Sequence, residues 1–237
     1  MNFQSVRRRK VHEDVAVQIE EAIILGTLVE GEALPSERDL MATFGVGRPA
    51  IREALLLLER TGFLQLSTGG RARITKPTVA VLIDQLSGSA KHLMAMPGGE
   101  QAFQEARRVF EAAIARHAAE IATDADVARL GAALEANRSA IDDMTAFERT
   151  DVAFHLVLAE IGQNPVFAAL HGAIAGWLAL QRKVSLRIEG AAGQALASHD
   201  QIYRAVAARQ PEQAGAAMDR HLRQVMLQYG KGKESTP

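Results

Sequence analysis

The sequence predicts a mainly α fold in two domains, an N-terminal winged helix-turn-helix followed by an all-helical antiparallel bundle. Three observations predict this class. Three segments between residues 11 and 60 carry apolar residues at helical spacing. Two short alternating segments then flank a Thr-Gly-Gly turn, as in a β-hairpin. From Val79 onward only helical patterns recur, separated by glycine and proline. At 237 residues the chain is long enough to bury a core in each domain.

The N-terminal domain is predicted to begin with two helices. Val15 and Ile19 share one face of the first helix, over residues 11–25. Ser36 is placed to cap a second helix that runs to about residue 44.

A third helix is predicted over residues 48–60, after a tight turn at Gly45. Pro49 is tolerated in its first turn because the N–H group there has no partner within the helix. Two helices joined by a glycine turn are typical of a helix-turn-helix. The apolar stripe of the third helix is formed by Ile51, Leu55 and Leu58.

The segments "FLQLS" and "RARIT" alternate apolar and polar residues, which predicts the two strands of a wing. The sequence Lys-Pro-Thr at residues 76–78 then breaks the chain. The winged domain is therefore assigned to residues 11–76, after a basic arm at residues 1–10. The helical domain is assigned to residues 77–229, and residues 230–237 are predicted to be disordered. The helices of the helical domain are predicted at residues 79–96, 100–121, 124–140, 145–162, 166–188, 194–209 and 211–229.

Composition excludes several kinds of site. The chain has no cysteine, which excludes disulfides and thiolate metal sites, so a metal must be bound by His, Asp or Glu. The first residues lack the apolar segment of a signal peptide, and no run reaches the roughly 18 apolar residues of a membrane span. We therefore expect a cytoplasmic protein with no membrane partner. The net charge of −1 by itself says nothing about nucleic acid.

The polar edge of the third helix carries two arginines. Arg48 and Arg52 are four residues apart and share the face opposite the leucine stripe. Arginine can bond guanine O6 and N7 together, so these side chains suit a recognition helix in the major groove. Arg38 is placed to hold a phosphate, and Thr68 and Gly69 at the hairpin tip to enter the minor groove. An ordinary amphipathic helix pair with solvated arginines is the alternative.

A run of four basic residues, which includes Arg7 and Arg8, precedes the first helix. Such a run is either a solvated terminus or an arm that contacts DNA phosphates. Its position next to a helix-turn-helix favours the arm.

Three of the seven histidines have companions at ligand spacing. Asp151 and His155 lie four residues apart on one face of a predicted helix, and His199 and His221 each share the apolar stripe of another. Singly, each is an ordinary hydrogen-bonded core residue. Together these four residues, the His3Asp set, face the bundle interior and suit a divalent metal, Zn²⁺ first, with Ni²⁺ or Mn²⁺ as alternatives. The other histidines are assigned structural roles: His12, His92, His117 and His171.

The segment "EGEALPSERDLMATFGVGRPAIREALLLLERTGFL" resembles the DNA-binding domain of the GntR family of bacterial regulators. The likeness spans about residues 12–75 and rests on the PSER segment, the G-V-x-R-x-x-[IV]-R-E-A-L pattern and the glycine-bearing wing. Pro49 departs from the pattern, because many members have a Ser or Thr there that bonds a phosphate. The resemblance implies DNA contacts at Arg38, Arg48, Arg52, Thr68 and Gly69.

Residues 79–228 resemble the FCD effector-binding domain of the FadR subgroup of this family, through "EARRVFEAAIARHAAE", "DVAFH", "GQNPVF", "SHDQIYRAV" and "MDRHL". The resemblance implies that the His3Asp set binds a metal ion whose coordination a carboxylate effector often completes. It also places Arg107 in the helix that lines the effector cavity. Arg182 is a second candidate for binding an anionic effector, and either arginine alternatively forms an ordinary ion pair. Several segments are especially similar to sialic-acid-responsive members, so sialic acid is the first effector to test.

We therefore expect a metabolite-responsive transcription regulator, a repressor that binds double-stranded operator DNA as a homodimer and is released by a small carboxylate or sugar acid. Two other classes remain open. A metal-dependent enzyme would use the His3Asp set to activate water, although no general base or nucleophile accompanies that set. A DNA-binding protein with a purely structural zinc would show no effect of a small molecule on its DNA affinity.

Overall fold

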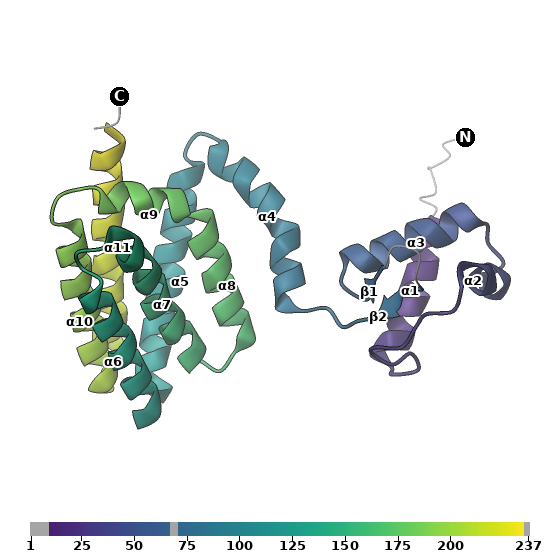
Figure 1. The fold of residues 1–237 in the computed structure, drawn as a ribbon, viewed down its shortest axis with the longest axis horizontal. Coiled ribbons are helices and arrows are strands. Elements are labelled where there is room, and N and C mark those ends of the chain that lie inside the picture. The colour runs from purple at the N-terminus through teal and green to yellow at the C-terminus, as the bar shows by residue number, and fades with distance from the viewer. Residues whose placement is uncertain (1–9, 67–70, 235–237) are drawn as a thin grey trace, which may run out of the picture. The chain divides into compact units, whose positions relative to one another are not determined.

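The structure is a computed structural model that describes residues 10–66 and 71–234 (Figure 1). The chain divides into two compact units, Met1–Gln85 and Leu86–Pro237. Each unit has a buried apolar core of its own. Four of the residues predicted to contact DNA lie outside the described ranges: Arg7, Arg8, Thr68 and Gly69.

The first unit is the predicted winged helix-turn-helix. Its helices are α1 (Val11–Ile24), α2 (Glu37–Phe44) and α3 (Arg48–Arg60), and its strands are β1 (Leu64–Gln65) and β2 (Arg73–Ile74). The strands pair antiparallel with Leu64 opposite Ile74. Arg73 also forms an isolated bridge with Ala33, which ties the wing to the segment before α2. The core that joins these elements includes Val15, Ile19, Leu40, Ile51, Leu58, Leu64 and Ile74.

The turn between α2 and α3 orients the third helix. The Ser36 hydroxyl caps α2 by accepting a hydrogen bond from the Asp39 amide at 3.3 Å. Gly45 ends the helix with a φ of 64°, a left-handed conformation that glycine adopts without the strain of a Cβ. Pro49 lies exposed in the first turn of α3, as predicted. The buried stripe of α3 then faces the core and its polar edge faces solvent.

The second unit is an all-helical bundle (Figure 1). Helix α11 lies against α5, α9 and α10, and helix α7 lies against α5, α6 and α8. No helix in the described part of the chain has both the length and the apolar character to cross a membrane. The core includes Ile114, Leu130, Phe154, Leu158, Ile202 and Met218. The bundle helices are α5 (Gly99–Ile121), α6 (Asp124–Ser139), α7 (Met144–Ile161), α8 (Pro165–Trp177), α9 (Ala179–Leu186), α10 (Ala191–Ala207) and α11 (Pro211–Glu234).

Helix α4 (Val79–Ala95) contains the division between the two units, whereas the predicted boundary lies before this helix. Its first turns belong to the first unit. The Gln85 amide donates a hydrogen bond of 2.6 Å to the Arg60 carbonyl. Val81 lies so close to Gly62 that a Cβ there would come within 3.0 Å of it. These contacts fix the start of α4 on the winged unit.

The single helix predicted over residues 166–188 is wrong, because two helices, α8 and α9, meet at Leu178. The backbone of Leu178 has φ −93° and ψ 16°, and its side chain is buried. The change of direction places Gln181, Arg182 and Ser185 of α9 in the bundle interior. Periodicity does not show this break, because apolar residues continue on both sides of it.

Helix α11 extends beyond the predicted helical domain. It reaches Glu234, so residues 230–234 of the predicted disordered tail are helical. Tyr229 donates a hydrogen bond of 2.8 Å to a carboxylate oxygen of Glu100 in α5, and Lys233 Nζ lies 2.9 Å from the same oxygen. These two contacts tie the last turns of α11 to the bundle.

Candidate functional site

The structure brings all four residues of the His3Asp set together. Asp151 and His155 come from α7, His199 from α10 and His221 from α11. Each residue offers one ligand atom, these atoms all lie within 4.8 Å of one another, and all four residues are buried. His155 Nε2 is 3.2 Å from His199 Nε2, which in turn is 3.5 Å from Asp151 Oδ1. Residues 70 positions apart in the sequence thus converge on one point.

Local sequence explains how α7 presents its two ligands. The Asp143 carboxylate caps α7 by accepting hydrogen bonds from the amides of Thr145 and Ala146. The four-residue spacing then places Asp151 and His155 on one helical face. The buried Phe154 and Leu158 flank that face and hold it against the core.

Two histidines of the site, His199 and His221, are kept neutral by their surroundings. Burial lowers the pKa of His199 to about 3, against the attraction of Asp151. Burial, together with the neighbouring His199 and His155, also holds the pKa of His221 well below its usual range. Neutral imidazoles and a carboxylate are the ligand forms that divalent Zn, Ni and Mn bind. The donor set therefore fits such an ion.

Sequence reasoning missed Glu111, a buried residue of α5 that borders the site. Its Oε1 accepts a hydrogen bond of 2.7 Å from Arg107 Nε, and its Oε2 is 2.5 Å from His155 Nδ1. Burial opposes ionisation of this carboxyl, but Arg107 and His155 hold its pKa well below the usual range. His171 Nδ1 lies 3.7 Å from Glu111 Oε1, so this histidine also borders the site. The four-residue spacing of Arg107 and Glu111 was a signal available in the sequence.

The two candidate anion-binding arginines differ in their ion-pair and hydrogen-bond partners. Arg107 is paired with Glu111, which raises the pKa of Arg107 in spite of its burial. Arg182 Nε finds no hydrogen-bond acceptor among the described residues and lies 3.7 Å from Asp151 Oδ2. Burial, and then the charge of Arg107, lower the pKa of Arg182. Arg182 therefore has the greater unused capacity to bind an anion.

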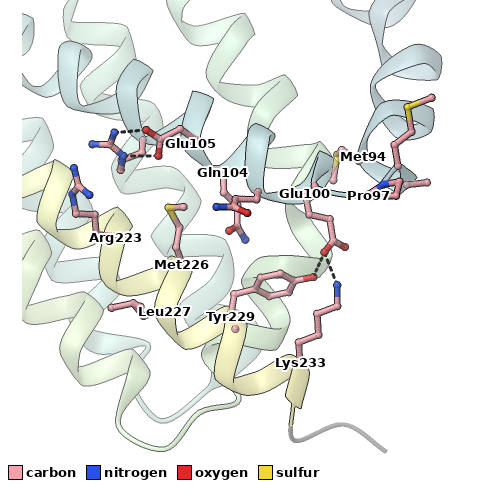
Figure 2. A pocket seen from close by; sticks show the side chains of 16 residues that line it. Met94, Pro97, Glu100, Gln104, Glu105, Arg223, Met226, Leu227, Tyr229 and Lys233 are labelled. Atoms are coloured by element: carbon pink, nitrogen blue, oxygen red, sulfur yellow. Dashed lines mark hydrogen bonds and ion pairs between the residues drawn. The ribbon is translucent and has the colours of Figure 1, made fainter.

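The cavity beside the site is small. Arg107, Leu178, Gln181 and Arg182 are among the residues that line a space of only about 10 Å³. A much larger cavity, of about 840 Å³, lies elsewhere and includes no member of the His3Asp set. Figure 2 shows this second cavity between α11 and the start of α5, with Glu100, Tyr229 and Lys233 meeting at one end. A ligand the size of a sugar acid would have to displace side chains to reach the His3Asp set.

The predicted DNA-reading edge of α3 is exposed. The side chains of Arg48 and Arg52 are 62% and 63% exposed, and that of Arg38 in α2 is 90% exposed. Sequence reasoning missed Glu37, whose carboxylate lies 3.2 Å from Arg52 Nε and 3.7 Å from Arg48 Nε. One acidic residue of α2 thus accepts a hydrogen bond from Arg52 and lies within ion-pair distance of Arg48.

Two family models match the chain, one within each of its two structural units. Residues 11–74 match the bacterial regulatory proteins of the gntR family, and residues 103–224 match the FCD domain. The FCD match includes the whole His3Asp set, and the gntR match includes Arg38, Arg48 and Arg52.

Curated relatives match nearly the whole chain. The HTH-type transcriptional repressor NanR of Klebsiella aerogenes is 42% identical over 233 residues, which cover 96% of this chain and 90% of the relative. The HTH-type transcriptional repressor NanR of Cronobacter sakazakii is 43% identical over 224 residues, which cover 94% of this chain and 86% of the relative.

Solved structures share the fold. A GntR protein of Streptococcus agalactiae aligns with a TM-score of 0.64 at 24% identity, over 90% of this chain and 98% of that one. McbR/YncC of E. coli aligns with a TM-score of 0.52 at 17% identity, over 94% of this chain and 99% of that one. Given its two matched domains and its relatives, this chain belongs to the GntR family and is a DNA-binding transcriptional repressor with an FCD domain rather than an enzyme.

Proposed function

We propose that this repressor binds a small carboxylate or sugar acid beside a divalent metal held by the His3Asp set, and that this binding releases it from operator DNA. The observation that carries the proposal is the convergence of four buried ligand atoms within 4.8 Å. Sialic acid is the first effector to test, because of the resemblance to sialic-acid-responsive regulators and the 42% identity to a NanR repressor. Zn²⁺ is the first metal to test, with Ni²⁺ and Mn²⁺ next.

Different residues are assigned to metal binding and to binding of the anionic effector. Three imidazoles and the Asp151 carboxylate supply the ligands, and a bound divalent ion supplies an electrophilic position for the effector's carboxylate. Arg182 supplies a positive charge 3.7 Å from Asp151, and Arg107 adds a second charge that Glu111 already balances. We therefore rank Arg182 before Arg107 as the residue that binds the anionic group.

Effector binding must also favour one arrangement of the protein over another. The cavity at Arg182 is about 10 Å³, so an effector enters only if the short helix α9 or its side chains move. Helix α9 packs against α7, α8, α10 and α11 and so contacts most of the bundle. In a homodimer in the cytoplasm, such a movement would change the spacing of the two winged units relative to their half-sites. A ligand with equal affinity for both arrangements would shift nothing.

Metal analysis and operator titration together test the proposal. Purified wild type supplemented with Zn²⁺ should hold about one ion per chain, and the His155→Ala/His199→Ala double variant should hold none. His117→Ala is the matched control, because His117 is a partly exposed histidine of the same unit that contacts Glu120. Sialic acid at ~100 times its dissociation constant should stabilise metal-loaded wild type by roughly 2.7 kcal/mol and lower its operator affinity.

Three results would contradict the proposal in different ways. A wild type without metal after supplementation removes the metal site. Bound metal with no effect of any sugar acid or carboxylate on DNA affinity favours the purely structural role. A double variant that still responds normally to effector separates the effector from the His3Asp set.

A further inference from the structure

Asn137 of α6 is the most completely buried amide beside the His3Asp set, with an exposed fraction of 0%. Its Nδ2 donates hydrogen bonds to the Phe147 carbonyl at 3.3 Å and to Thr150 Oγ1 at 3.0 Å. The Thr150 hydroxyl donates its own hydrogen to the Ala146 carbonyl at 2.9 Å, so it accepts from Asn137. Exchanging the amide's two ends would set its oxygen against the Phe147 carbonyl. The orientation of Asn137 is therefore determined by its partners.

This orientation decides which nitrogen of His199 carries hydrogen. Asn137 Oδ1 lies 2.9 Å from His199 Nδ1, and an amide oxygen only accepts hydrogen bonds. His199 must therefore donate from Nδ1. A neutral imidazole has one N–H group, so Nε2 of His199 presents a lone pair to the interior of the set.

Glu111 imposes the same choice on His155. Arg107 donates to one oxygen of Glu111, and the other oxygen lies 2.5 Å from His155 Nδ1. An ionised carboxylate is also an acceptor only, so the hydrogen of His155 belongs on Nδ1. The Nε2 atoms of His155 and His199 lie 3.2 Å apart, and Asp151 Oδ1 lies 3.5 Å from that of His199.

We infer that Asn137 is a positioning residue for the metal site: it fixes His199 as an Nε2 ligand. The inference rests on the proposed metal site and adds a residue to it from a helix, α6, that contributes no ligand. An outer hydrogen bond of this kind orients a ligating imidazole and raises its basicity. Removing the acceptor should therefore weaken metal binding about 10- to 100-fold.

Three variants separate positioning from packing. Asn137→Leu removes the acceptor and the donors. Asn137→Asp keeps an acceptor for His199 but loses both donated hydrogen bonds. Thr150→Val is the matched control, because it removes a partner of Asn137 on the side away from His199. Metal affinity is measured by competition titration with Zn²⁺ and Ni²⁺ in the full chain, and stability by urea unfolding of the metal-free protein.

We expect Asn137→Leu to lose about 10- to 100-fold in metal affinity, while Asn137→Asp and Thr150→Val stay within a few-fold of wild type although both lose stability. Equal affinity of Asn137→Leu and wild type would overturn the inference. So would losses of affinity that follow the losses of stability across all three variants.

Nitrogen-15 spectra of the histidine side chains in metal-free wild type test the inference without any ion. They should show His199 as the Nδ1–H tautomer, and an Nε2–H tautomer would overturn the assignment. A wild type that binds no metal but shows the Nδ1–H form contradicts the proposed metal site and leaves the positioning of His199 by Asn137 supported.

Discussion

The carboxylate of Glu37 at the start of α2 lies 3.2 Å from Nε of Arg52 in α3. Its other oxygen is 3.7 Å from Nε of Arg48, so one acid spans the turn of the helix-turn-helix to both arginines. The arginine side chains remain more than half exposed, which leaves their outer N–H groups available for a base edge. Glu37 therefore orients Arg52 and balances part of the charge of both arginines.

Replacing Glu37 should change the discrimination between sequences more than the overall affinity. Glu37→Gln removes a negative charge next to the DNA surface, so binding to random DNA should strengthen because phosphate repulsion is lost. Specific binding should gain less, because Arg52 loses its orienting partner. The ratio of operator to random affinity, measured by fluorescence titration at fixed salt, should fall.

The matched control for this variant is Glu53→Gln, which removes the same charge from α3. Glu53 contacts His12 of α1 at 2.7 Å. A specificity ratio that is unchanged in Glu37→Gln, or lowered equally in Glu53→Gln, would show that only net charge matters.

Arg48 and Arg52 should be needed for operator recognition and dispensable for folding. Each change to alanine should weaken specific binding by roughly 1–3 kcal/mol if the side chain bonds a guanine. Stability should stay within about 0.5 kcal/mol, because both side chains are exposed. A gel-shift titration that gives the wild-type operator affinity for both variants would disprove the assignment.

The basic arm should act on all DNA sequences alike. Removal of the basic run, residues 7–10, should weaken binding to operator and to random DNA by similar factors, because phosphate contacts carry no sequence information. Each lost contact should reduce the slope of log affinity against log salt by about 0.9. A truncated protein with an unchanged slope would show that the arm is a solvated terminus.

Arg182 should matter for the effector and Arg107 for stability. Arg182→Met should abolish the effect of sialic acid on operator affinity and keep wild-type operator binding without effector. The side chain loses one hydrogen bond, from Nη2 to the Ala175 carbonyl at 3.2 Å, and two looser ion pairs, with Asp151 at 3.7 Å and Glu148 at 3.9 Å.

Arg107→Met should instead lower the free energy of unfolding by about 3–5 kcal/mol, because it leaves the buried Glu111 without its 2.7 Å partner. Urea unfolding of the metal-free proteins compares the two variants. A larger loss of stability in Arg182→Met than in Arg107→Met would contradict this division of roles.

The sequence by itself determined the order of the elements, apart from the division between α8 and α9, and the four residues of the His3Asp set. The period of apolar residues follows the backbone geometry of each helix, so it marks where α1, α2, α3 and the bundle helices lie. The same period places Asp151, His155, His199 and His221 on the inward faces of three helices of one bundle. Their convergence was therefore predictable although no single contact was.

Only the tertiary structure decided which other residues border the His3Asp set and which acidic residues pair with the arginines. Asn137 and His171 show no spacing in the sequence that links them to the site, and the four-residue spacing of Glu111 links it only to Arg107. Glu37 reaches Arg52 across a turn. The break at Leu178 and the helical end of α11 likewise depend on packing against neighbouring helices. Periodicity reports which face of a helix is buried, whereas hydrogen-bond partners and ion pairs depend on distances between helices that no local pattern contains.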